Sequence, residues 1–198
     1  MASKRGGGNA KKATTGASHD KEWVPSLMGE TELNEMVEAG VLPDRVTIGW
    51  RPVDGEPYPM PHTDELVVFE DYFWRGLGLP VHPFLRDLLE FWRVSFCNLH
   101  LNTILHIYVF IHFCEVYLGI LPHFNVFRHL FWLKKKGGGD SKVVGGVYLQ
   151  LHDEMASEYI TVPLNTSLKG WNARWFYMKQ NHPAIRCDVD HILENQKS

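Results

Sequence analysis

The sequence predicts an α+β fold in which central buried helices are followed by a small C-terminal antiparallel sheet. Helical spacing of apolar residues, with start and stop signals, dominates between residues 30 and 133. Runs of β-branched and aromatic residues are concentrated after residue 143. No repeating strand–helix–strand pattern is present, which argues against a doubly wound parallel sheet. With 198 residues, 44% of them hydrophobic, the chain is long enough for one domain with its own core.

The elements are expected in the following order. A first helix is expected over residues 32–39, with Thr31 as its N-cap and Gly40 as its stop. Prolines recur between residues 43 and 63, so the run at residues 46–50 predicts a short strand followed by an irregular segment. Four further helices are expected at residues 66–75, 83–92, 102–118 and 123–133.

The apolar run at residues 104–121 is about long enough to span a bilayer. Glu115 lies within it, and a central carboxylate costs roughly 2.5–3.5 kcal/mol on insertion scales. We therefore expect a helix buried in the middle of the fold and no membrane contact. Residues 134–140 then form a charged loop, residues 143–151 and 159–162 are expected to pair as a hairpin, and residues 175–178 form a third strand.

The ends of the chain differ in composition from its middle. Residues 1–22 predict a disordered basic tail, residues 23–180 one folded domain, and residues 181–198 a C-terminal tail. No apolar core follows the first basic residues, so we expect no signal peptide and an intracellular chain, in the nucleus or the cytoplasm. The net charge of −3 hides an acidic segment, residues 20–71, which carries a net charge of −10.

The sequence gives only weak indications of a catalytic or metal-binding site. His112 and Glu115 share a helix face and could begin a metal site, but a hydrogen bond between them in the interior is the favoured interpretation. Cys114 is expected to be a buried, inert thiol. Three widely spaced cysteines suggest neither a disulfide framework nor a zinc module. No P-loop is present, and we expect no metal, no cofactor and no small-molecule substrate.

Basic residues near late aromatic residues suggest a weak nucleic-acid site. The aromatic residues of segment 171–177 could stack bases while nearby cations meet phosphates, although core packing is favoured for the rings. The candidate nucleic-acid-binding residues are Lys134, Lys135, Lys136, Lys142, Lys169 and Arg174.

Several motifs occur in one linear order. The central ones are LGLPVHPF at residues 77–84, LHLNTILHI at residues 99–107 and CEVYLGILPHF at residues 114–124. Flanking motifs are WVPS at residues 23–26, VGGV at residues 144–147 and SLKGW at residues 167–171. Together they resemble the plant gypsy-type transposon domain that is often labelled "transposase (putative), gypsy type".

The resemblance implies a protein descended from a gypsy-type retroelement, with no established catalytic residues to transfer. Members commonly continue into long regions prone to form coiled coils, so this chain is expected to be a truncated copy or an isolated domain. The sequence has no YxDD, no D[ST]G and no HHCC or CCHC pattern, which favours a non-enzymatic domain. A structural, Gag-like role with self-association is the first hypothesis, a nucleic-acid-binding module the second, and a transposase-like enzyme with dispersed acidic ligands the third.

Overall fold

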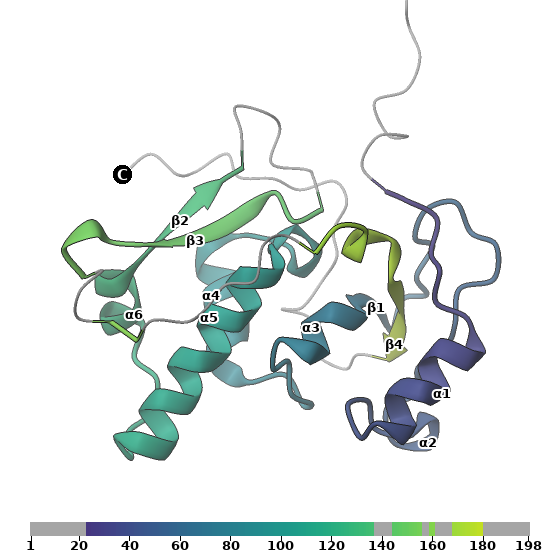
Figure 1. Cartoon of the computed structure of the whole chain (residues 1–198), viewed down its shortest axis with the longest axis horizontal. Coiled ribbons are helices and arrows are strands. Elements are labelled where there is room, and N and C mark those ends of the chain that lie inside the picture. Colours follow the sequence, from purple (N-terminus) through teal and green to yellow (C-terminus); the bar gives the residue numbers. More distant parts are fainter. Residues whose placement is uncertain (1–22, 137–143, 156–158, 161–167, 180–198) are drawn as a thin grey trace, which may run out of the picture.

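The computed structural model describes residues 23–136, 144–155, 159–160 and 168–179. Its helices and strands give a mixed fold, so the predicted α+β class is confirmed (Figure 1). Six α-helices are found in the described residues: α1 Glu30–Glu38, α2 Arg45–Ile48, α3 Glu70–Trp74, α4 Pro83–Trp92, α5 Leu101–His112 and α6 Phe124–Leu130. The strands there are β1 Glu65–Phe69, β2 Phe131–Lys135, β3 Val147–Leu151 and β4 Trp175–Lys179.

The strands form two antiparallel pairs. β1 pairs with β4, with Glu65 opposite Lys179 and Phe69 opposite Trp175. β2 pairs with β3. α5 contacts both α3 and β3 and so connects the two pairs (Figure 1). Within the described residues, no helix is both long enough and apolar enough to cross a membrane.

Aromatic rings fill the core around β1 and β4. The ring centroids of Phe69 and Trp171 lie 4.9 Å apart, and those of Tyr72 and Phe96 lie 5.0 Å apart. The hydroxyl of the buried Tyr72 donates to the carbonyl oxygen of Leu99 at 2.6 Å. Burial raises the pKa of Tyr72 well above its usual value, so the side chain remains a neutral donor.

A buried hydroxyl links α5 to β3. Thr103, which has no exposed surface, accepts a hydrogen bond from the Leu149 amide at 3.2 Å. Its hydroxyl donates to the carbonyl oxygen of Val147 at 3.4 Å. The edge of β3 that faces away from β2 is therefore hydrogen-bonded to the first turn of α5.

A polar cluster lies at the Glu65 end of the β1–β4 pair. The Arg51 guanidinium makes two hydrogen bonds to Glu65, at 2.6 Å and 2.8 Å, and lies 3.7 Å from the centroid of the Tyr177 ring. The Tyr177 hydroxyl donates to Glu56, and the Met60 amide donates to that hydroxyl at 2.7 Å. These contacts hold the proline-rich segment against the sheet.

The expected strand at residues 46–50 is wrong, because residues 45–48 form the short helix α2. Asp44 caps it by accepting a hydrogen bond from the Thr47 amide at 2.9 Å, and Gly49 ends it with a φ of +63°. Val46 is 98% exposed, so its β-branched side chain has no sheet to pack against. Local capping thus outweighs β propensity.

The expected helix at residues 66–75 is correct only for its second half. Residues 66–69 are buried in strand β1, and the helix α3 begins at Glu70. A strand that is buried on both faces has a continuous apolar run, which periodicity cannot distinguish from a buried helix. The pairing with β4 decides the conformation.

Three smaller expectations also need correction. Gly29, not Thr31, is the N-cap of α1, and its amide donates to Glu32 at 2.9 Å. The helix expected to reach residue 133 ends at Leu130 and continues as β2, which also takes in the first two residues of the loop expected at residues 134–140. β2, not the segment at residues 159–162, is the partner of β3; residues 159 and 160 are not in a strand, and residues 161–162 lie outside the described residues.

Candidate functional site

The end of α5 presents large apolar side chains to solvent. After His112 the helix continues as one π-helical turn, η3 Phe113–Tyr117, and the chain then bends at Gly119. Five side chains here are more than half exposed, and we call them the apolar knob: Val116 at 62%, Tyr117 at 73%, Leu118 at 52%, Ile120 at 51% and Leu121 at 81%. Concentrated apolar exposure of this kind marks interaction sites.

The backbone of the apolar knob is well defined. The Leu118 amide donates to the carbonyl oxygen of Phe113 at 3.2 Å, and the Ile120 amide donates to that of Cys114 at 3.0 Å. Gly119 allows this reversal because its φ is +63°, a conformation that is strained for other residues. The Tyr117 ring stacks on Phe113 at 6.1 Å between centroids. The conformation of the knob is therefore fixed by contacts within the chain.

Glu115 links the knob to the start of α4. Nδ1 of His82 accepts a hydrogen bond from the Phe84 amide at 3.1 Å, which leaves Nε2 to carry the proton of the neutral ring. Nε2 lies 3.0 Å from Oε1 of Glu115. The expected buried pair of His112 and Glu115 is wrong, because His112 is exposed and the wider π-helical turn moves Glu115 away from the i+3 face.

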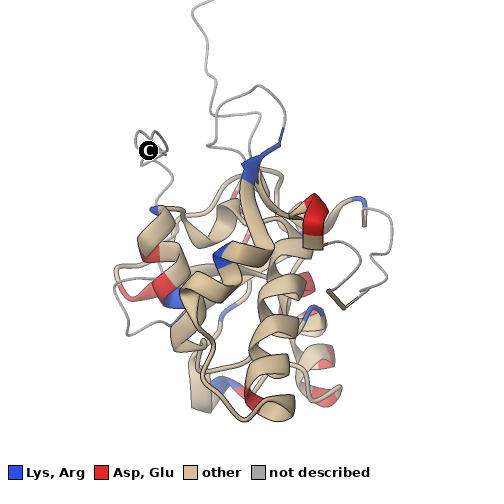
Figure 2. Cartoon of the chain, turned by 90° about the vertical axis from the view of Figure 1, so that its left-hand side faces the viewer, with Lys and Arg blue, Asp and Glu red and all other residues tan. Residues whose placement is uncertain are grey.

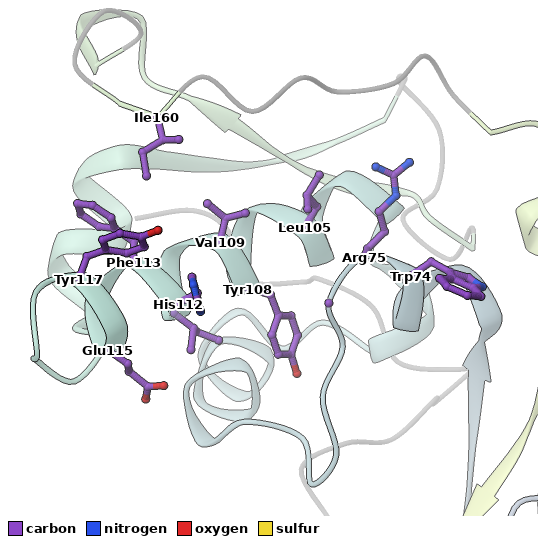
Figure 3. Close-up of a pocket in the computed structure, with 12 residues that line it drawn as sticks. Trp74, Arg75, Leu105, Tyr108, Val109, His112, Phe113, Glu115, Tyr117 and Ile160 are labelled. Carbon is purple, nitrogen blue, oxygen red and sulfur yellow. The ribbon is translucent and has the colours of Figure 1, made fainter. Parts of the chain in front are cut away.

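A groove of about 520 Å³ lies beside the apolar knob (Figure 3). Trp74 and Arg75, at the end of α3, form one side, and Tyr108 and His112 of α5 line its floor. Tyr117 borders the groove and also belongs to the knob. Burial raises the pKa of Tyr108 to about 12, so this side chain is neutral near pH 7.

The described residues contain little catalytic chemistry. Among them, no group of three or more His, Cys, Asp or Glu side chains is placed to hold a metal ion. Cys114 is a buried free thiol, as expected, and burial raises its pKa, which makes it a poor nucleophile. Cys97 is disulfide-bonded. The three cysteines therefore include a disulfide, although an odd number this small does not make a framework of several bridges.

Three histidines have a structural role that sequence reasoning missed. His82, His100 and His123 are the N-caps of α4, α5 and α6. In each, Nδ1 accepts a hydrogen bond from the backbone amide two residues later, at 3.1–3.3 Å. Histidine is not among the usual N-cap residues, so only its position directly before each apolar run could have indicated this role.

The predicted nucleic-acid-binding residues lie on several different elements. Lys134 and Lys135 lie on β2 and Lys136 follows it, and all three are exposed. Lys169 is exposed just before the short helix at Trp171–Ala173. Figure 2 shows Lys and Arg scattered among acidic residues on the face that it presents. Lys142 lies outside the described residues.

Arg174 forms a structural ion pair, and the aromatic residues near it pack in the core. Arg174 forms an ion pair with Glu70, and this hydrogen bond raises the pKa of the guanidinium. Trp171 and the side chains of β4 from Trp175 to Met178 are buried. The favoured core-packing role of these rings is thus confirmed, and none of them presents an open face to a base.

The fold and the site define an α+β domain with an exposed apolar knob beside a groove. Residues 67–135 match the model of a family described as "Putative gypsy type transposon". The matched segment runs from β1 through β2 and contains the whole knob. The resemblance to the gypsy-type transposon domain is therefore confirmed in this segment, about a third of the chain. Neither a curated protein nor a solved structure matches the chain.

Proposed function

We propose that this chain is a non-enzymatic assembly domain of a gypsy-type retroelement-derived protein, with a Gag-like structural role, and that it associates with itself through the apolar knob. One observation carries the proposal. Five large apolar side chains stand more than half exposed on a hydrogen-bonded turn within the family-matched segment.

The free energy for association comes from removing the knob from water. Burying a leucine-sized side chain contributes about 1.5–3 kcal/mol. The fixed backbone lowers the ordering cost of binding, because Gly119 and the amide of Ile120 already set the shape of the turn. Two reactive groups next to the knob are already engaged, which supports a non-enzymatic role. The Cys114 thiol is buried, and the Glu115 carboxylate is bound to His82.

Light scattering of the purified chain over a concentration series tests the proposal. The wild-type mass should rise with concentration, and Leu121→Asp should shift the association curve to at least tenfold higher concentration, because a charge would have to be buried at the contact. Val46→Asp is the matched control, since Val46 is 98% exposed but lies on α2, outside the knob. If Leu121→Asp associates as the wild type does, the proposal is wrong.

Nucleic-acid binding is a second candidate, supported by the three adjacent exposed lysines at the end of β2. Each phosphate neutralised by a lysine releases counterions, so affinity should fall steeply with salt concentration. Fluorescence anisotropy with a labelled single strand should show that Lys134→Glu combined with Lys135→Glu weakens binding for all sequences alike. Binding that survives this change, or that is lost only on removal of residues 1–20, would exclude the folded domain as the binder.

A further inference from the structure

The groove beside the apolar knob gives the self-association a specific geometry. We propose that two copies of the chain dock reciprocally, with the knob of each copy seated in the groove of the other. This inference rests on the proposed function, and it adds the receptor surface and the symmetry of the contact.

The groove runs along α5 from Leu105 to His112 and reaches Tyr117, which is a residue of the knob (Figure 3). Tyr117 belongs to both surfaces, and Glu115 borders the groove directly before the knob begins. In a two-fold dimer, residue i of one copy contacts residue j of the other and the reverse contact is also made. A two-fold axis near Tyr117 would therefore bring both knobs to both grooves in a single docking step.

The chemistry of the two surfaces is complementary. The chain has no Lys, Arg, Asp or Glu between Val116 and Phe127, so the knob brings no such charge into the groove. The groove lining includes the apolar side chains of Trp74, Tyr108 and Val109. Its one cation among the described residues, Arg75, lies near the carboxylate of Asp71. The carboxylate in the lining, that of Glu115, is already bound to His82. Contacts between identical subunits are more apolar than other protein interfaces, which favours a second copy over a charged partner.

The exposed area is sufficient for a specific dimer. With about 150–200 Å² of surface for each large side chain, the exposed fractions of the knob amount to roughly 500–600 Å². Two knobs buried in one dimer give about 1,000–1,200 Å², before the groove walls are counted, and specific interfaces begin at this size. Trp74 adds to the walls, because it is 55% exposed.

Mixing two variants tests the reciprocal geometry. Leu121→Asp damages the knob, and Trp74→Ala removes one groove wall that is solvent-exposed. Each variant alone should be monomeric at concentrations where the wild type is dimeric, because both contacts of its dimer are damaged. An equal mixture should form a dimer of intermediate affinity, since one intact knob meets one intact groove. Circular dichroism and a thermal melt of each variant establish that it is folded.

The outcomes separate this inference from the proposed function. Loss of association in Leu121→Asp with wild-type behaviour of Trp74→Ala would overturn the reciprocal geometry and leave a knob-to-knob contact. A folded pair of variants that stays monomeric when mixed would overturn it as well. Wild-type association of Leu121→Asp would overturn both proposals, and so would a wild-type chain that is monomeric at every concentration. Val46→Asp should associate as the wild type does in all these measurements.

Discussion

Replacing Thr103 by valine should destabilise the domain although it leaves the side-chain volume almost unchanged. Thr103 is completely buried, and its hydroxyl accepts from the Leu149 amide at 3.2 Å and donates to the Val147 carbonyl at 3.4 Å. Valine leaves the buried Leu149 amide without that acceptor, which costs about 1–3 kcal/mol. The thermal midpoint of a chain of this size should fall by roughly 2–4 °C for each kcal/mol.

Urea unfolding of the wild type, Thr103→Val and Thr103→Ser measures the effect. The serine variant keeps the hydroxyl and loses one methyl group, worth about 1 kcal/mol. Amide hydrogen exchange distinguishes the two causes: the Leu149 amide should exchange faster in Thr103→Val and stay protected in Thr103→Ser. A valine variant as stable as the wild type, with an unchanged exchange rate at Leu149, would refute the role given to this hydroxyl.

Two further outcomes are expected from the caps and the turns. Burial, together with nearby positive charge on Lys136, lowers the pKa of His100, so the unfolded chain takes up this proton more readily. The contribution of His100 to the free energy of unfolding should be fully present above about pH 6.5 and should be lost as the pH falls below that value. In urea titrations, His100→Asn should reduce the dependence of the unfolding free energy on pH. Gly145→Ala should lower the thermal midpoint more than Gly55→Ala does: both glycines have a positive φ, but only at Gly145 would a Cβ lie 2.5 Å from Trp171. Equal melting of the two glycine variants, or an unchanged pH slope in His100→Asn, would contradict these assignments.

The elements predicted well are those that begin or end at a proline or glycine in the local sequence. Pro83 starts α4, and Gly119 ends the turn that follows α5, as the sequence indicates. β1 was missed because residues 66–69 are buried on both faces, and only the distant β4 makes them a strand. Partners of this kind are set by tertiary contacts and have no local signal.

The candidate site was predicted less well than the fold. The apolar run at residues 104–121 indicates a single buried helix, but burial ends near Cys114 and the rest is exposed. Hydrophobicity alone cannot tell a core helix from a contact surface, because both are apolar. The groove was not foreseen at all, since Trp74 and Tyr108 are distant in sequence and meet only when α3 packs on α5.

The pairing of β1 with β4 has a consequence for synthesis of the chain. Phe69 and its partner Trp175 are separated by about a hundred residues, and a ribosome adds roughly 5–20 residues each second. The buried strand β1 thus leaves the ribosome several seconds before its partner exists. During that interval Leu66–Phe69 is an unpaired apolar edge, open to chaperones or to neighbouring nascent chains.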